Sequence, residues 1–115
     1  MVRDTRPISW VKAARKDFEK FPKGAQLEIR RALTIVAEGG KPDIAKPLAG
    51  FGSGVFEIAL RFRSDAFRTI YALQIDADIW VIHAFQKKST SGIKTPKREI
   101  DLVRQRLKRL KEILG

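Results

Sequence analysis

The sequence predicts a single α+β domain over residues 1–115, with an N-terminal helical hairpin packed on a small antiparallel sheet and a C-terminal amphipathic helix. Three observations predict this fold class. Apolar residues recur at helical spacing near both ends of the chain, they alternate with a period of two in its middle, and 115 residues leave room for one compact core.

Two consecutive helices are expected near the N-terminus. Residues 10–21 carry apolar side chains at spacings of three, four and three, which form one helical stripe, and Pro22 should end this helix. A second helix follows to about Glu38, where Gly39 and Gly40 provide a stop signal. Because only a few residues join the two helices, they should form an antiparallel hairpin.

A short antiparallel meander is expected in the middle of the chain. Lys41–Gly54 is rich in proline and glycine, which predicts a loop. Val55–Arg63 alternates with a period of two, and Phe67–Ile75 and Ile79–Phe85 follow after short connections that suit antiparallel neighbours. A short strand around Val2–Ser9 is also compatible with the pattern.

The last part of the chain combines a basic loop with a helix. The loop is expected from Lys87 to Thr95, with Thr95 as N-cap, Pro96 in the first turn and Glu99 as a first-turn acid. Apolar residues then repeat at spacings of three and four, so this helix should pack through one seam.

The charge balance indicates an anionic partner. The chain has 24 Lys and Arg against 13 Asp and Glu, a formal net charge of +11, and its last thirty residues hold ten of the basic and three of the acidic residues. Such a balance favours encounter with nucleic acid or an anionic membrane surface. No apolar run is long enough to cross a bilayer and no signal-peptide core is present, so we expect a soluble cytoplasmic protein without a membrane partner.

Several classes of catalytic site are excluded by composition. The absence of cysteine rules out disulfides, thiolate catalysis and a cysteine zinc site, and a single histidine rules out a two-histidine nuclease. The few carboxylates fall mainly on helix surfaces and in turns, as Asp76 and Asp78 do, so a two-metal nuclease is not expected. Gly50, Gly52 and Gly54 precede a strand, which favours turn positions over a phosphate loop. We predict no metal and no cofactor.

A basic site can still cleave RNA, because the ribose 2′-hydroxyl can attack its own adjacent phosphate. Arginine can neutralise the charge that builds on the phosphorane, and lysine or histidine can transfer protons if burial or nearby cations lower the pKa. Candidates on the expected strands and strand ends are Arg61, Arg68, Lys87, Lys88 and His83.

The arginine candidates have structural alternatives. Arg61 and Arg63 are equally well explained as the solvated face of an alternating strand. The alternative for Arg68 is a structural ion pair with Glu57 or Asp65.

The same holds for His83 and Tyr71. His83 lies between apolar neighbours, which is more typical of a hydrogen-bonded core histidine than of a catalyst. Tyr71 is expected in the core, although its ring is also suited to stacking on a base. The residues alone therefore indicate a basic domain directed at nucleic acid, and no particular reaction.

Three segments resemble a known family. They are KPLAGFGSGVFEI, FRTIYAL and VIHAFQKKSTSGIKTPKREIDLVRQRLKRL, and the likeness begins at ISWVKAARKDF and covers most of the chain. These segments closely resemble the phage-derived branch of the RelE/HigB toxins, for which the string HxFxKKxxxGIxTPxxEI is unusually specific. The resemblance implies the RelE/ParE-like fold, in which helices pack on a curved antiparallel sheet.

The resemblance also implies a function. It points to the toxin of a type II toxin–antitoxin system, an endoribonuclease that cleaves mRNA in the ribosomal A site without a metal and so inhibits translation and growth. The products would carry 2′,3′-cyclic phosphate and 5′-hydroxyl ends. A small cognate antitoxin, commonly with a helix-turn-helix domain, would neutralise the toxin in a hetero-oligomer.

The resemblance further implies roles for single residues. Arg61 and Arg68 would bind phosphate and stabilise the transition state, while Lys87 and Lys88 would bind substrate or transfer protons. Substrate-binding candidates around this set are Arg63, Tyr71, His83, Lys94, Lys97 and Arg98. The chain lacks the C-terminal histidine or tyrosine that some of these toxins use, so the general base stays unassigned.

Two other functions stay open. A ParE-like relative would poison DNA gyrase by binding it, without nuclease chemistry. A non-catalytic nucleic-acid-binding module would use the same basic surface, and fold alone does not separate these functions. The retained basic loop favours RNA as the target.

Overall fold

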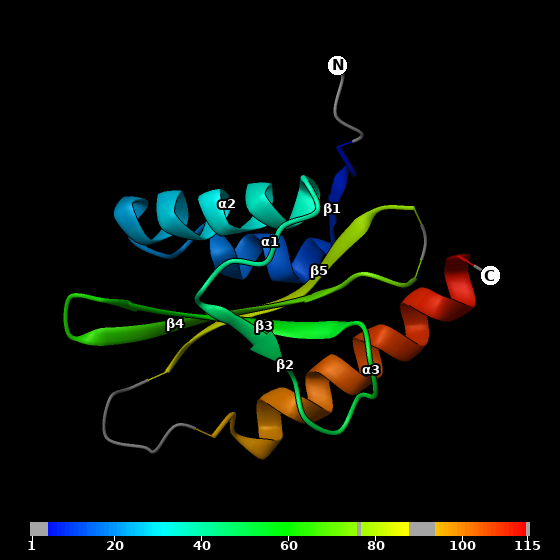
Figure 1. Ribbon diagram of the computed structural model, residues 1–115. Helices are drawn as coiled ribbons and strands as arrows, with labels where there is room; N and C mark the ends of the chain where they lie inside the picture. Colours follow the sequence, from blue (N-terminus) through cyan, green and yellow to red (C-terminus); the bar gives the residue numbers. More distant parts are fainter. Residues whose placement is uncertain (1–4, 76, 88–93, 115) are drawn as a thin grey trace.

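The fold consists of a five-stranded sheet with helices on both faces. The computed structural model describes residues 5–75, 77–87 and 94–114 (Figure 1). The strands are β1 (Ile8–Trp10), β2 (Ala45–Pro47), β3 (Val55–Phe62), β4 (Asp65–Ala72) and β5 (Ile79–Lys87). The helices are α1 (Lys12–Phe18), α2 (Lys23–Ala37) and α3 (Lys97–Leu114). The predicted α+β fold class is confirmed: the α1–α2 pair covers one face of the sheet and α3 crosses the other (Figure 1).

The sheet is larger than the expected meander. Its strand order is β1-β5-β4-β3-β2, so a short strand is added at each edge of the three predicted strands. The N-terminal strand lies at Ile8–Trp10 and pairs in parallel with β5, with Ile8 opposite Ile79. β2 lies inside Lys41–Gly54, so the prediction of a loop throughout that segment is wrong. Proline is tolerated in β2 because an edge strand leaves one row of backbone groups unpaired.

A bulge in β5 changes which side chains face α3. Ile70 lies opposite His83, but the next residue, Tyr71, lies opposite Val81, so Ile82 is an extra residue in β5. Ile82 packs in the cluster under α3, and His83 bonds to side chains of α3. In a strand without a bulge, neighbouring side chains point to opposite faces, so Ile82 and His83 would not both face α3. The bulge also increases the local twist of the sheet.

Apolar packing covers both faces of the central strands. On the side of α1 and α2, the cluster includes Phe18, Ile29, Leu33, Ile58 and Phe67. On the side of α3, it includes Ile70, Ile82, Phe85, Val103 and Leu107. The apolar stripes predicted for the helices therefore do face the sheet. Because β4 is covered on both faces, its last six residues are all buried.

No helix in the described part of the chain is long and apolar enough to cross a membrane.

Candidate active site

The register of β3, β4 and β5 brings three predicted cations to the α3 side of the sheet. Arg61 lies opposite Ala66, which in turn lies opposite Lys87, so Arg61 and Lys87 share one row across the three strands. Arg68 lies in the next row on the same face, because residues two apart on a strand point the same way. We call Arg61, Arg68 and Lys87 the basic cluster.

A buried carboxylate holds one member of this cluster. Arg68 donates a hydrogen bond from Nη1 to Oε1 of Glu57 at 3.0 Å, and both side chains are almost fully buried. Glu57 is therefore the partner that Arg68 takes, one of the two that the sequence suggested. Lys46 lies opposite Glu57 on β2, so it also faces the α3 side. From the sequence, Glu57 was considered only as a partner of Arg68, although an acidic residue between apolar neighbours on a strand is a signal of a buried polar site.

Lys87 has an environment that suits proton transfer. Only 5% of the residue is exposed, and its ammonium group donates a hydrogen bond of 2.5 Å to the backbone carbonyl of Lys94. Burial lowers the pKa of Lys87, and the nearby charge of Arg68 lowers it further, while Glu57 opposes these effects. A lysine whose pKa is lowered gives up its proton more readily near neutral pH.

The segment that leads into α3 lies over the basic cluster. The backbone of Lys94 accepts the bond from Lys87, and the hydroxyl of Thr95 donates to Oε2 of Glu57 at 2.6 Å. The expected N-cap at Thr95 is wrong, because the carbonyl of Pro96 accepts the first helical bond, from the amide of Ile100. A cavity of about 390 Å³ opens beside this segment and is lined by Lys46, Pro47, Leu48, Ala49, Glu57, Lys94, Thr95 and Ile100.

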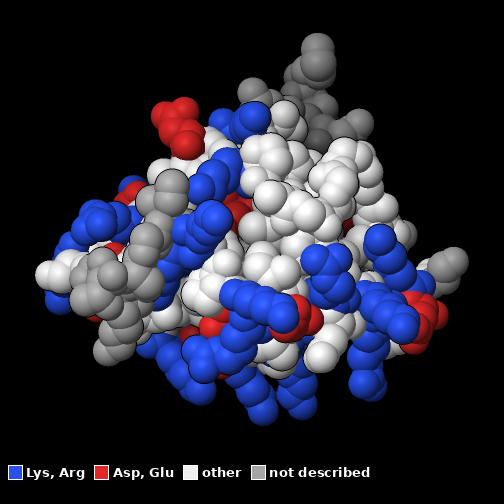
Figure 2. All heavy atoms as spheres, turned by 90° about the horizontal axis from the view of Figure 1, so that it is seen from below, with Lys and Arg blue, Asp and Glu red and all other residues white. Residues whose placement is uncertain are grey.

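The remaining basic candidates are exposed around the cluster. Arg63 is in the two-residue turn between β3 and β4, with φ of 59° and its guanidinium 5.3 Å from the centre of the Phe62 ring. Exposed side chains before and at the start of α3 are those of Lys94, Lys97 and Arg98. Lys88 lies outside the described residues. Figure 2 views the α3 side, where Lys and Arg side chains predominate over acidic ones across much of the surface.

Tyr71 lies on the opposite face of the sheet from the basic cluster. Its side chain is 2% exposed in the apolar cluster under α1 and α2, and its ring stacks on Phe56 with 5.5 Å between centroids. Burial raises the pKa of Tyr71 to about 12. Because the sheet separates Tyr71 from the basic cluster, its substrate-binding assignment is corrected to that of a core aromatic.

His83 joins β5 to α3 through both ring nitrogens. Nε2 lies 2.7 Å from Oε1 of Glu99, and Nδ1 lies 2.7 Å from Nη1 of Arg106. Arginine can only donate, so Nδ1 accepts and the Nε2 proton is donated to Glu99, which corresponds to a neutral imidazole. Both nitrogens are engaged in packing α3 on the sheet, so the substrate-binding assignment of His83 is likewise corrected to that of a buried structural histidine.

This arrangement predicts a pH dependence of stability. Burial lowers the pKa of His83 below its usual 6.5, the hydrogen bond to Glu99 opposes this, and the charge of Arg106 lowers it again. Below pH 6.5 the unfolded chain takes up a proton that the folded chain resists, so the free energy of unfolding should fall as the pH decreases toward the folded-state pKa.

The single histidine makes this prediction easy to measure. An NMR titration of the imidazole gives the folded-state pKa, and denaturant unfolding between pH 7 and pH 5 gives the stability. His83→Gln should remove this part of the pH dependence. A ring that titrates at or above pH 6.5 would contradict the assignment.

Comparisons with known proteins place the chain in a family. Residues 16–108 match the family described as Phage derived protein Gp49-like (DUF891). The chain belongs to this family. The match runs from within α1 into α3, so it includes the whole sheet apart from β1. No curated protein matches the sequence.

Solved structures that are similar to the chain include a toxin and a toxin–antitoxin complex. A mutant of the E. coli toxin RelE in the free state is 18% identical, with a TM-score of 0.61 over 91% of this Gp49-like chain and 97% of that chain. The toxin–antitoxin complex RelBE2 from Mycobacterium tuberculosis is 16% identical, with a TM-score of 0.49 over 72% of this chain and 92% of that chain. The match to RelE confirms the predicted RelE/ParE-like fold, and the resemblance to phage-derived RelE-type proteins drawn from the sequence is confirmed by the family match.

Proposed function

We propose that this Gp49-like protein is the toxin of a type II toxin–antitoxin system and an endoribonuclease that cleaves mRNA in the ribosomal A site without a metal. The observation that carries this proposal is the basic cluster, in which Arg61, Arg68 and Lys87 share one face of the sheet beside the Glu57 carboxylate. The RelE-like fold and the family of the chain support it.

The basic cluster offers a group for each demand of the reaction. The 2′-oxygen loses its proton and bonds to phosphorus, the bond from phosphorus to the 5′-oxygen breaks, and the 5′-oxygen gains a proton. Arg61 is exposed and would take the scissile phosphate first, and Arg68 would add a second fork of donors to the phosphorane. Lys87, with its lowered pKa, would protonate the 5′-oxygen.

Glu57 is our candidate for the proton acceptor. Its carboxylate contacts Arg68 and lies near enough to Lys87 to influence the pKa of that lysine. When the substrate phosphate attracts Arg68, the carboxylate of Glu57 would be released from that hydrogen bond and could accept one from the 2′-hydroxyl. Lys94 and Thr95 cover this group in the described structure, so productive binding would require those two residues to move aside.

We also propose that a cognate antitoxin of the helix-turn-helix type binds the toxin in a hetero-oligomer in the cytoplasm. The net charge of +11 predicts that an acidic segment of the antitoxin covers part of the basic surface. Its affinity should then fall as salt is added, since screening weakens exposed charge pairs.

A translation reaction with and without ribosomes tests the enzymatic proposal. The protein is added to each reaction and the new mRNA ends are mapped. We expect cuts within A-site codons, with 5′-hydroxyl ends, only when ribosomes are present. Intact mRNA together with trapped gyrase–DNA complexes would favour the ParE-like alternative, and binding of RNA without either effect would favour a non-catalytic module.

A further inference from the structure

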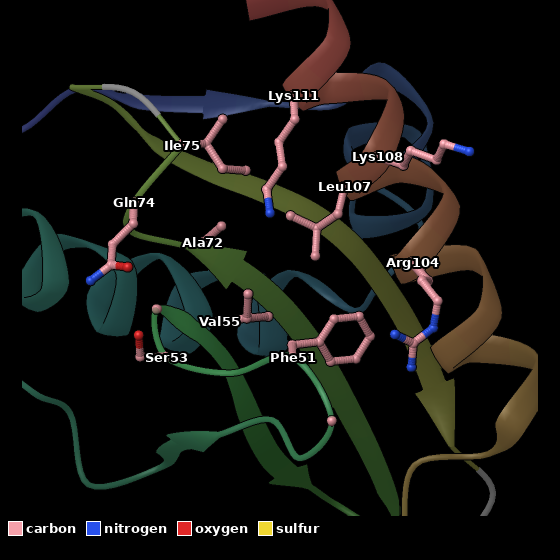
Figure 3. A pocket seen from close by; sticks show the side chains of 12 residues that line it. Phe51, Ser53, Val55, Ala72, Gln74, Ile75, Arg104, Leu107, Lys108 and Lys111 are labelled. Atoms are coloured by element: carbon pink, nitrogen blue, oxygen red, sulfur yellow. The ribbon is translucent and has the colours of Figure 1, made fainter. Parts of the chain in front are cut away.

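A second basic site lies at the other end of the α3 side of the sheet. A pocket of about 500 Å³ is lined by Gly50, Phe51, Ser53, Gly54, Val55, Ala72, Gln74, Ile75, Arg104, Leu107, Lys108 and Lys111 (Figure 3). Val55 and Arg61 are six residues apart on β3, which puts roughly 20 Å between this pocket and the basic cluster. The two sites are therefore distinct.

Three cations from α3 form one wall of the pocket. Arg104, Lys108 and Lys111 are four and three residues apart on α3. Arg104 and Lys111 extend toward the pocket, whereas the side chain of Lys108 is directed away from it (Figure 3). Lys108 and Lys111 make no ion pair with any described residue, and no carboxylate is among the described residues that line the pocket. The pocket thus presents positive charge that the surrounding described residues do not neutralise.

The rest of the pocket is suited to a flat apolar group with polar edges. Val55, Ala72 and Leu107 lie between its two sides, and Ser53 and Gln74 lie across from the cations of α3 (Figure 3). The hydroxyl of Ser53 and the side-chain amide of Gln74 can each donate and accept hydrogen bonds, as the edge of a nucleobase requires.

The glycine-rich segment and an aromatic ring complete the rim. The guanidinium of Arg104 lies 4.6 Å from the centre of the Phe51 ring, a cation–π contact that holds both side chains in place. Gly54 has φ of +89°, and a Cβ there would lie 2.9 Å from the Gln74 side chain. Glycine at this position therefore lets Gln74 lie against the segment at the pocket edge.

We infer that this pocket binds one nucleotide of single-stranded RNA. Its phosphate contacts Arg104 and Lys111, and its base lies on the apolar floor with an edge toward Ser53 and Gln74. Cations combined with apolar and aromatic surface are the means by which proteins hold unpaired nucleotides. The volume is within the range of small-molecule sites. An acidic peptide would satisfy the cations but would leave the apolar floor and the two polar side chains without a matched partner.

This inference goes beyond the proposed cleavage reaction, since binding at the pocket needs no chemistry. The experiment uses the ¹⁵N-labelled full chain with Arg61→Ala. Because this variant is expected to cleave RNA poorly, the measurement reports binding at the pocket independently of the cleavage reaction. The probes are a three-nucleotide RNA and inorganic phosphate, and affinity is measured from amide chemical shifts. We expect the RNA to shift amides at residues 50–55 and 72–75 and to bind more tightly than phosphate.

A charge-matched pair of variants separates the pocket from general attraction. Arg104→Gln/Lys111→Gln should weaken RNA binding about tenfold and reduce the slope of log affinity against log salt by about 0.7, because neutralisation of one single-strand phosphate contributes about 0.7 to that slope. Lys16→Gln/Lys41→Gln removes the same charge from two exposed positions that do not line the pocket, one in α1 and one between α2 and β2, and should leave that slope nearly unchanged. Unaltered amide spectra outside the pocket confirm that each variant folds.

Three results would overturn the inference. Equal affinity for phosphate and RNA would indicate a simple anion site. Equal losses of affinity in the two variant pairs would indicate non-specific attraction. Pocket shifts caused by a short glutamate peptide, but not by RNA, would indicate an acidic protein segment as the occupant.

Discussion

Arg61→Ala is expected to reduce mRNA cleavage by about 10²- to 10³-fold, the usual loss when one preorganised donor to developing negative charge is removed. Arg61 lies in the same row as Lys87, and under the proposed function both side chains would contact the same phosphate. The residue is exposed, so its removal should disturb packing little. Cleavage rate in the ribosome-containing reaction and growth inhibition on expression measure the effect, and thermal unfolding checks the fold.

A matched control removes the same charge elsewhere. Arg15 is on α1, on the other face of the sheet, and its exposed pair with Glu19 contributes little to stability. Arg15→Ala should therefore cleave at the parental rate. Arg61→Lys should restore only part of the activity, because an ammonium group lacks the planar fork of guanidinium. If Arg61→Ala cleaves as fast as Arg15→Ala, the placement of the phosphate at the basic cluster is wrong.

Glu57→Ala is expected to lower the free energy of unfolding by about 3–5 kcal/mol, as removal of one partner from a buried ion pair commonly does. Glu57 is 1% exposed, and its two oxygens accept bonds from Arg68 and Thr95. Without its carboxylate, residue 57 no longer offsets the repulsion between the buried positive charges of Arg68 and Lys87. Denaturant unfolding measures the loss of stability. An m-value equal to that of the parent would show that the variant exposes the same surface on unfolding.

Two further variants test the cause of that loss. Glu57→Leu combined with Arg68→Met replaces the pair with apolar side chains and should recover much of the stability while abolishing cleavage. Glu19→Ala removes an exposed carboxylate from its pair with Arg15 and should cost less than about 1 kcal/mol. A Glu57→Ala variant no less stable than Glu19→Ala would show that the buried pair contributes nothing to folding.

The secondary structure was largely predictable because it follows local rules. The stripe that contains Phe18 is buried, and the apolar residues that alternate around Ile58 pack against the same cluster, with Ile58 itself fully buried. Boundaries were less predictable. α1 ends at Phe18, and the amides of Lys20 and Phe21 bond back as turns to the carbonyls of Asp17 and Phe18, so Phe21 reaches the core from outside the helix. β1 and β2 are short strands that exist through pairing with distant segments, which no local pattern reports.

The candidate site was predictable in composition but not in arrangement. Basic side chains at Arg61, Arg68 and Lys87 could be selected as candidates because of their residue type and their position on expected strands. The partnership of Thr95 with Glu57 and the burial of Lys87 depend on how the segment before α3 returns over the sheet. The burial of Tyr71 under α1 and α2 depends on which face of β4 those helices cover.

Local periodicity and charge are thus sufficient to establish the helices, the central strands and the excess of positive charge, since each depends on residues close together in the chain. Which cations meet and which become buried depends on strand register, on the bulge at Ile82 and on the docking of α3. Those contacts join residues far apart in sequence, and a pKa such as that of Lys87 depends on distance and burial in three dimensions.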